Sequence, residues 1–511
     1  MKKICRVFFS RYAISALLIV LQVLVVAALF LGAAASRYHI AALAMMFSFG
    51  AFLNLVNRDT NPEYKIPWSF IILALPPVGA ILYFCFYQRK LSRQEVSRLR
   101  RSVSGMRRNM LASDGTEKLY SESQKAAGMA RAILNDDPLA EVYSASSSRF
   151  FATGEDFFDA FIEDISSAKK YIFLEYFIID EGELWSRVHR ILTEKAAAGV
   201  DVRLLYDDVG CMKTLPSYYE RTLRKEGIRA YRFSRVSARV SSIHNNRDHR
   251  KICVVDGVCA YTGGVNIADE YINRITRFGY WKDGGVRLSG DSVKGLLKLF
   301  LSAWELTTGE FSDSDRQLLD RIGTSESDGG YYLVYGSGPA PIYPRSNGKN
   351  VFLNIINQAE RYVYITTPYL IIDYDLTEAL RSAAMRGIDV RIITPGIPDK
   401  KRIKIMTKSS YPYLIESGVK IYEYSRGFIH EKTLVSDDKC AVVGTINLDY
   451  RSLVHHFEDA VWMWGSPTVD VALREIKKTL SDSERVGFEH TRLRFTEWIF
   501  KMGMRIFAPL L

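Results

Sequence analysis

HRKICVVD at residues 249–256 and HEKTLVSD at residues 430–437 are two copies of one pattern, H-x-K-x-x-x-x-D. Six residues separate each closing Asp from a matched tail, GGVN at 263–266 and GTIN at 444–447. The chain has 8 His in 511 residues. If Lys and Asp each fill about one position in twenty, one such spacing arises by chance on the order of 0.02 times. Two copies with matching tails therefore indicate an internal repeat.

Both motifs have the pattern of a β-strand that ends in a hairpin. The apolar runs 252–255 and 433–435 are β-prone and are followed by turn-forming residues. His and Lys are two residues apart, so their side chains leave the same face of a strand. Each motif should therefore present a His–Lys pair to one site: His249 with Lys251, and His430 with Lys432. The closing residues Asp256 and Asp437 stand at strand ends, where we expect salt bridges that brace the fold rather than contacts with substrate.

A pocket formed by both motifs would hold the groups that phosphodiester chemistry needs. One His attacks phosphorus, and the other protonates the leaving alkoxide. The Lys groups, with the amides of the tail residues Asn266 and Asn447, stabilise charge on the non-bridging oxygens. We expect no metal ion, because these cationic groups do the work of one and no cluster of His, Cys or acidic residues shows metal-ligand spacing.

A nucleophilic His must present one tautomer, so a carboxylate should hold its other ring nitrogen. Glu458 follows the second motif, and Asp283 occupies the matching place after the first. We therefore expect Glu458 to orient His430 and Asp283 to orient His249. Two other carboxylates lie close enough in the sequence to compete: Asp459 and Glu270.

The similarity of the two halves extends upstream of the motifs. Residues 171–180 and 362–371 are β-branched and aromatic runs suited to buried strands. A helical stretch follows each run, and then the related segments GVDVRLLY at 199–206 and GIDVRII at 387–393. Strand, helix and strand at this spacing form a βαβ unit, which predicts an α/β fold of two fused repeats with mixed β-sheets flanked by helices. The site should lie where the repeats face each other.

These residues resemble the phospholipase D superfamily, whose signature H-x-K-x4-D-x6-G-[SGT]-x-N matches at both sites. Further stretches resemble the bacterial cardiolipin synthases within it: 264–271, 281–283, 336–339, 447–452 and 505–511. The resemblance covers nearly the whole chain. One departure is visible, since many relatives have Ser at the second position of the tail, where this chain has Gly264 and Thr445. No phosphate hydrogen bond is therefore carried over to position 264.

The resemblance implies that His249 is the nucleophile and His430 the general acid, with a phosphatidyl-histidine intermediate and no cofactor. It implies transfer of a phosphatidyl group from one phosphatidylglycerol to another, giving cardiolipin and glycerol. The alternative is a membrane-bound phospholipase D that hydrolyses phospholipids to phosphatidic acid. A nucleic-acid phosphodiesterase and an inactive membrane scaffold are further alternatives, but a nuclease gains nothing from a bilayer anchor, so we expect no nucleic-acid partner. The oligomeric state is left open.

Four segments are expected along the chain: membrane-anchoring helices at 1–90, a basic and polar linker at 91–140, the first repeat at 141–328, and the second repeat at 329–511 with a C-terminal amphipathic helix. The 6 Cys show no C-x-x-C or paired spacing, so neither a zinc site nor a disulfide framework is predicted. The net charge is +11, and the basic run 89–108 directly follows an apolar stretch. Anionic phospholipids, including phosphatidylglycerol, are the expected partners of this run.

Three stretches near the start carry no Asp, Glu, Lys or Arg: 12–36, 38–57 and 66–88. The first and third are long enough to cross a bilayer, and the middle one is borderline. Pro67, Pro76 and Pro77 should kink the third. Basic residues before the first stretch and after the last favour the cytoplasm, so we expect two crossings of the cell membrane and a cytoplasmic catalytic part. Three crossings would place that part outside.

The stretch from Glu489 to Leu511 mixes basic and apolar residues at helical spacing. Such a helix is suited to the lipid interface. The alternative is a helix that packs against the second repeat.

Overall fold

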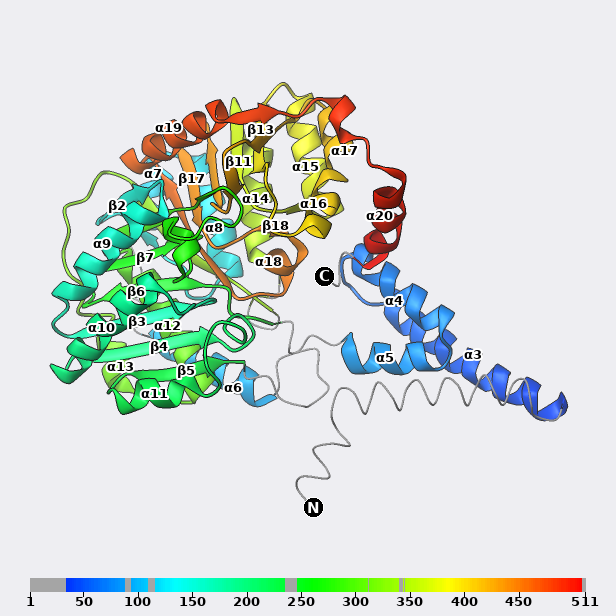
Figure 1. Ribbon diagram of the computed structural model, residues 1–511, viewed down its shortest axis with the longest axis horizontal. Coiled ribbons are helices and arrows are strands. Elements are labelled where there is room, and N and C mark those ends of the chain that lie inside the picture. Colours follow the sequence, from blue (N-terminus) through cyan, green and yellow to red (C-terminus); the bar gives the residue numbers. More distant parts are fainter. Residues whose placement is uncertain are drawn as a thin grey trace, which may run out of the picture. The chain divides into compact units, whose positions relative to one another are not determined.

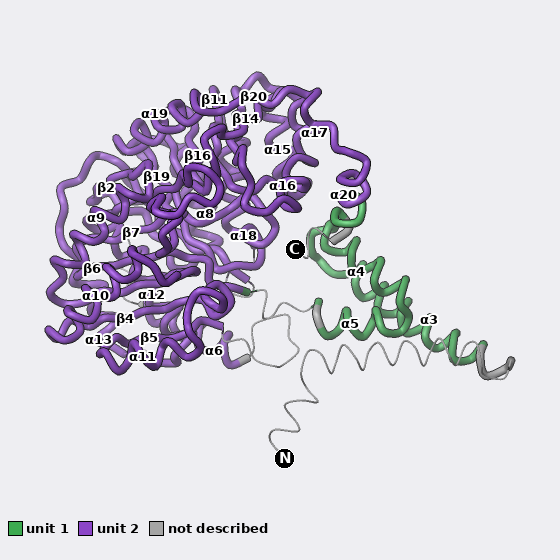
Figure 2. Tube along the Cα trace, viewed as in Figure 1, with its two compact units in different colours: residues 1–90, 236–246, 502–511 green, residues 91–235, 247–501 purple. Residues whose placement is uncertain are grey.

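The computed structural model describes residues 34–87, 93–108, 115–234, 246–310, 312–339, 343 and 345–507. The chain divides into two compact units (Figure 2), one of residues 1–90, 236–246 and 502–511 and the other of residues 91–235 and 247–501. Both H-x-K motifs lie in the second unit, called the enzyme unit below. Most of the expected first membrane stretch, 12–36, lies outside the described residues.

The first repeat is built on a seven-stranded mixed sheet of order β2-β9-β7-β6-β3-β4-β5 (Figure 1). β3, β4 and β5 run parallel, whereas the neighbours from β3 through β6, β7 and β9 to β2 are antiparallel. The strands are β2 (Ser146–Phe151), β3 (Tyr171–Tyr176), β4 (Asp201–Asp207), β5 (Arg229–Phe233), β6 (Lys251–Val255), β7 (Cys259–Gly263) and β9 (Gly285–Gly290). The helices are α9 (Gly154–Ser167), α10 (Glu183–Ala197), α11 (Tyr219–Lys225), α12 (Val293–Thr308) and α13 (Asp313–Gln317).

The second repeat has the same topology in a nine-stranded sheet of order β1-β10-β19-β17-β16-β11-β13-β14-β20. Its strands are β1 (Val142–Tyr143), β10 (Tyr331–Ser337), β11 (Tyr362–Thr366), β13 (Asp389–Pro395), β14 (Lys420–Tyr424), β16 (Thr433–Ser436), β17 (Cys440–Gly444), β19 (Glu458–Trp464) and β20 (Ser483–Arg485). Its helices are α14 (Asn347–Gln358), α15 (Tyr374–Met385), α16 (Lys401–Lys408), α17 (Tyr411–Glu416), α18 (Tyr450–Val454) and α19 (Pro467–Ser481). The predicted pair of α/β repeats with mixed sheets is confirmed.

The two repeats share one apolar core. Helix α12 follows the last strand of the first sheet and packs on that sheet and on β10 of the second. Helix α19 occupies the equivalent place in the second repeat and packs on its own sheet and on β2 of the first. Buried side chains of both helices and both sheets, among them Phe300, Trp304, Val461 and Met463, belong to the same cluster. This shared core holds the two sheets together, and β7 and β9 of the first sheet contact β17 of the second.

The segment expected as a linker, 91–140, is largely helical. It contains α6 (Arg93–Arg108), α7 (Gly115–Glu122) and α8 (Gln124–Asp136). Apolar residues at helical spacing bury one face of α8 against α14 of the second repeat, with Met129, Ala130 and Ile133 in its core. β1, which we placed in the first repeat, pairs instead with β10 of the second. Residues that precede most of the first repeat therefore pack on the second repeat, α8 on α14 and β1 beside β10.

In the N-terminal unit, one described helix is long and apolar enough to cross a bilayer, α3 (Ala34–Val56), over Tyr38–Val56. We expected the third stretch to cross the bilayer and the middle one to be borderline in length. The structure reverses this, because the candidate span lies in the middle stretch. The third stretch is divided into α4 (Pro62–Ala74) and α5 (Val78–Phe86), of 13 and 9 residues. At 1.5 Å per residue these reach about 20 and 14 Å, short of the roughly 30 Å hydrocarbon layer. The helix ends before Pro76 and Pro77, which lack the N–H that would continue it, whereas Pro67 lies inside α4.

The expected C-terminal helix is present as α20 (Phe495–Phe507). Four large apolar side chains on it are exposed: Phe495, Trp498, Ile499 and Met502. Residues 508–511 lie outside the described part of the chain.

Candidate active site

The two motifs occupy equivalent central positions in the two sheets. β6 carries Lys251, and β16 begins directly after Lys432, with each His two residues earlier. β6 pairs with β3 in the same antiparallel arrangement by which β16 pairs with β11. His249 and His430 are each only 7% exposed, and Lys251 and Lys432 are buried. The expected motif strands are confirmed, but the His–Lys pairs do not lie wholly on them, since both His and Lys432 lie just before the strand and only Lys251 is part of it.

Each motif is hydrogen-bonded to the other repeat at its His. The His249 backbone N–H donates to the Phe457 carbonyl at 2.9 Å, and the His430 N–H donates to the Lys282 carbonyl at 2.7 Å. Just before His430, β15 (Gly427–Ile429) pairs in parallel with β8 (Tyr280–Lys282). A parallel bridge between Asp248 and Phe457 is the counterpart before His249. The two short pairings join the repeats at the site.

As a result, each carboxylate contacts the motif His of the other repeat. Glu458 directly follows Phe457, and its Oε2 lies 2.8 Å from Nδ1 of His249. Asp283 directly follows Lys282, and its Oδ2 lies 2.6 Å from Nδ1 of His430. Our assignment of Glu458 to His430 and of Asp283 to His249 is therefore wrong in its pairing. The physical reason is that each carboxylate follows a backbone segment that hydrogen-bonds to the opposite repeat.

The second tail position supports these carboxylates. The Thr445 hydroxyl donates to Oε2 of Glu458 at 2.5 Å. At Gly264 a Cβ would lie 2.0 Å from Oδ1 of Asp283, so a side chain there would collide with that carboxylate. The departure at position 264 thus has a structural reason, because glycine leaves room for Asp283.

Burial sets the protonation of the basic groups. Burial lowers the pKa of His249 to about 3, although Glu458 opposes this, and it lowers the pKa of His430 well below its usual range. Both imidazoles are thus neutral near pH 7, as a nucleophile requires. Burial also lowers the pKa of Lys251 to about 8 and that of Lys432 to about 7, against the attraction of nearby carboxylates. Lys251 also lowers the pKa of His430, so the two motifs act on one another.

The two carboxylates differ in charge. Burial alone would raise the pKa of Glu458, but the His249 and His456 imidazoles hold it well below its usual range. Burial raises the pKa of Asp283 to about 6, with Lys432 opposing. Glu458 is therefore ionised throughout the neutral range, whereas Asp283 titrates just below it.

The tail amides are both buried at the site but differ in their partners. Asn266 accepts a hydrogen bond from the Ile178 N–H at 3.0 Å and donates to the Tyr271 hydroxyl at 2.7 Å. The Oδ1 of Asn447 has no hydrogen-bond partner among the described residues. Asn266 is thus tied into the wall of the site, whereas the amide oxygen of Asn447 is an acceptor without a partner among the described residues.

The motif Asp residues brace the fold, as expected, but chiefly through the backbone. Asp256 accepts three hydrogen bonds of 2.7 Å from the N–H groups of residues 169–171. Asp437 accepts from the N–H groups of residues 360–362 and also forms an ion pair with Lys125 at 3.2 Å. Each Asp therefore fixes the entry of the buried strand beside its motif strand, β3 or β11.

Sequence reasoning did not identify His456 as a site residue. Its Nδ1 lies 3.6 Å from Oε1 of Glu458, and its ring centroid lies 5.5 Å from that of His249. The ligand atoms of His249, His456 and Glu458 lie within 4.8 Å of one another and could hold a metal ion. The statement that no cluster has metal-ligand spacing is thus corrected, because residues 207 positions apart in the sequence meet here. The adjacent pair His455–His456, just before Glu458, was the available signal.

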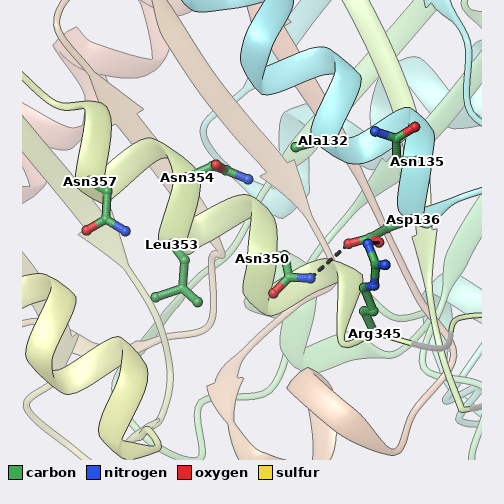
Figure 3. A pocket seen from close by; sticks show the side chains of 8 residues that line it. All are labelled: Ala132, Asn135, Asp136, Arg345, Asn350, Leu353, Asn354 and Asn357. Atoms are coloured by element: carbon green, nitrogen blue, oxygen red, sulfur yellow. Dashed lines mark hydrogen bonds and ion pairs between the residues drawn. The ribbon is translucent and has the colours of Figure 1, made fainter.

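A separate surface pocket of about 420 Å³ lies between α8 and α14 (Figure 3). Its lining is largely polar: Ala132, Asn135, Asp136, Arg345, Asn350, Leu353, Asn354 and Asn357. Asn350 donates to Asp136 at 2.8 Å across it. None of the expected site residues lines this pocket, so the motifs and not this cavity define the active site.

Two buried imidazoles, each held by a carboxylate of the other repeat and accompanied by a lysine, define a two-repeat phosphodiester-processing enzyme of the phospholipase D type. The family model described as "Cardiolipin synthase, PLD-like domain" matches residues 161–276 and 352–480, and the model "Phospholipase_D-nuclease N-terminal" matches residues 46–86. A cardiolipin synthase of Alkalihalophilus pseudofirmus is 32% identical over 478 residues, which cover 92% of each chain. The chain belongs to this cardiolipin synthase family and is a phosphatidyltransferase.

Two further proteins are similar to this chain over most of its length. An uncharacterized protein of Streptococcus mutans is 40% identical over 465 residues, which cover 90% of this chain and all of that one. The crystal structure of phosphatidylserine synthase from Haemophilus influenzae superposes with a TM-score of 0.55 at 14% identity, covering 75% of this chain and 98% of that chain. At that identity the likeness concerns the fold alone.

Proposed function

We propose that this protein transfers a phosphatidyl group from one phosphatidylglycerol to another through a phosphatidyl-histidine intermediate and releases glycerol. The observation that carries the proposal is the pair of neutral, buried imidazoles, each held at Nδ1 by a carboxylate. This arrangement leaves Nε2 of both rings for chemistry at one phosphorus. The family supports the choice of lipid substrates and product.

In the first step, Nε2 of His249 attacks phosphorus, and the P–O bond to the glycerol headgroup breaks. His430 in its imidazolium form gives its proton to the departing alkoxide, which leaves as glycerol. The phosphate charge of the substrate and the neighbouring Asp283 favour that imidazolium. His249 is the better nucleophile of the two, because its partner Glu458 stays ionised and stabilises positive charge on the ring.

In the second step the proton movement is reversed. Neutral His430 takes the proton from a glycerol hydroxyl of a second phosphatidylglycerol, and the resulting oxygen attacks phosphorus. The P–N bond breaks, cardiolipin leaves, and His249 is neutral again. Water in place of the second lipid would give phosphatidic acid, the product of the alternative hydrolytic function.

The lysines and tail amides are the proposed phosphate ligands. Nζ of Lys251 lies 2.5 Å from the carbonyl of His249, and Nζ of Lys432 lies 2.9 Å from Nδ1 of His430, so both ammonium groups lie beside the reacting imidazoles. They and the Asn447 amide supply positive potential where charge develops in the transition state. Asn266 would contribute the amide N–H that it does not use on Tyr271.

We further propose a location in the cell membrane with the enzyme unit on the cytoplasmic side. Support comes from the span Tyr38–Val56 and from the basic run that follows the N-terminal unit. The exposed apolar stripe of α20, flanked by Arg494 and Arg505, fits an anionic bilayer surface.

The test is incubation of the purified full chain with phosphatidylglycerol alone and identification of the products by mass spectrometry. Cardiolipin and glycerol in equal amounts support the proposal. Phosphatidic acid as the main product would favour the hydrolase. The His249→Ala protein is the control for contaminating activity and should form neither product.

A further inference from the structure

The pseudo-symmetry of the active site is broken at one position. His456 and Trp281 each precede a His-holding carboxylate by two residues. Each places its ring 5.5 Å from the motif His of the opposite repeat, His456 beside His249 and Trp281 beside His430. An indole offers no lone pair to a metal, whereas an imidazole does. One half of the site therefore has a potential metal ligand that the other half lacks.

The geometry of the His456 side fits a small metal ion. Ligand atoms about 2.0–2.1 Å from a tetrahedral zinc lie roughly 3.3 Å apart. Nδ1 of His249 lies 2.8 Å from Oε2 of Glu458, and Nδ1 of His456 lies 3.6 Å from Oε1 of the same carboxylate. Two imidazoles and one carboxylate are a donor set of zinc sites, and a fourth position would be open to water.

We propose that His249, His456 and Glu458 form an inhibitory binding site for Zn²⁺ or a similar transition-metal ion. On binding, the metal takes the lone pair of Nδ1 of His249, and the proton that Nδ1 shared with Glu458 moves through solvent to Nε2, so that the ring stays neutral and no net proton is released. A neutral imidazole with a metal on Nδ1 carries its proton on Nε2. Nε2 then has no lone pair with which to attack phosphorus. The inhibition, but not the binding, rests on the proposed role of His249 as nucleophile.

The charged groups around the proposed site set its affinity for a metal ion, and the residues around each His restrict binding to the His249 side. The Lys251 ammonium lies close enough to His249 to lower its pKa, so it also opposes a bound cation. Glu458 is ionised and already faces both rings, which favours the cation. The His430 side has Asp283 but no second imidazole, so the inhibition concerns the nucleophile side.

Binding is measured without turnover, by calorimetric titration of the detergent-solubilised full chain with Zn²⁺ and by the visible absorption of bound Co²⁺. The variant is His456→Asn. The matched control is His189→Asn. His189 lies on α10, in another part of the enzyme unit, and its Nε2 lies 2.6 Å from Oε2 of Glu226. We expect one tight ion per chain in the wild type and in His189→Asn, with tetrahedral Co²⁺ bands. Affinity should fall at least tenfold in His456→Asn.

Inhibition is measured with phosphatidylglycerol and buffered Zn²⁺, each variant relative to its own zinc-free rate. Wild type and His189→Asn should lose turnover at the zinc concentration that fills the site, and EDTA should restore it. His456→Asn should keep its turnover at the same zinc concentration. Equal binding by His456→Asn, binding without inhibition, or activation by zinc would each overturn the proposal. Failure of the proposed function is distinguishable, because it would appear as absence of cardiolipin from the zinc-free wild type.

Discussion

Glu458 of the second repeat accepts a hydrogen bond from Nδ1 of His249 in the first, at 2.8 Å, while Asp283 of the first repeat does the same for His430 of the second, at 2.6 Å. Neither repeat therefore contains a complete His–carboxylate pair of its own. The site is complete only when the two repeats are docked, which gives a physical reason for both motifs to be in one chain.

The exchanged pairing predicts which variant affects which step. Glu458→Gln should slow formation of the adduct on His249 by roughly 10³–10⁴-fold, because the amide favours the wrong tautomer of the ring. Asp283→Asn should leave adduct formation largely intact with a substrate analogue that has a good leaving group. Rapid-quench measurement of the adduct checks both. If Asp283→Asn alone abolished it, pairing within each repeat would be correct.

The division of labour between the imidazoles gives a second prediction. His249→Ala and His430→Ala should both abolish turnover of phosphatidylglycerol, because a poor alkoxide leaving group needs attack and protonation. In His430→Ala, an analogue with a good leaving group should still label His249, and the adduct should persist without a base for the acceptor. Peptide mass spectrometry after quenching at neutral to alkaline pH locates the label. A label on His430 in His249→Ala, with none in the reverse variant, would invert the two roles.

The lysines predict an alkaline limb in the pH profile. The pKa of Lys432 is about 7 and that of Lys251 about 8, both lowered by burial. Their charged forms support catalysis, so kcat/KM should fall as the pH rises through about 7 to 8. Lys432→Arg keeps its charge, so the fall should move towards pH 8. Below about pH 6, protonation of Asp283 should reduce activity on the acid side. A profile that is flat from pH 6 to 9 would remove the lysines from the mechanism.

The motif Asp residues should matter for stability rather than for chemistry. Asp256→Ala removes the acceptor of three backbone N–H groups, which should cost roughly 2–4 kcal/mol of unfolding free energy. Thermal unfolding of the solubilised protein measures this, with Asp313→Ala as an exposed control because its carboxylate makes one surface ion pair. At a temperature where Asp256→Ala is folded, its kcat should stay within about threefold of wild type. A normal melting temperature with lost turnover would assign Asp256 to the chemistry.

The orientation in the membrane is testable at α7. Ser121 is exposed at the end of that helix, so Ser121→Cys in a Cys-free background gives a reporter on the enzyme unit. We expect a membrane-impermeant thiol reagent to label it in permeabilised cells only. Labelling in intact cells would place the enzyme unit outside and require an odd number of crossings.

The sequence by itself determined the repeat, the α/β class, the motif strands and the bracing role of Asp256 and Asp437. These features follow from local patterns, because strand periodicity and the spacing of His and Lys depend on neighbouring residues. The residue types indicated the two-histidine chemistry, and the likeness to known enzymes added the lipid substrate and the role of each His. The break at Pro76 and Pro77 is also visible locally, because proline lacks the backbone N–H that continues a helix.

Only the tertiary structure decided which carboxylate serves which imidazole. Glu458 lies 28 residues from His430 and 209 from His249 in the sequence, yet it contacts His249. The deciding contacts are the backbone hydrogen bonds from His249 to Phe457 and from His430 to Lys282, which form only when the shared core brings the two repeats together. The same docking places His456 beside His249. Sequence patterns report local periodicity, whereas these neighbours are set by the packing of two repeats whose contacts are far apart in the chain.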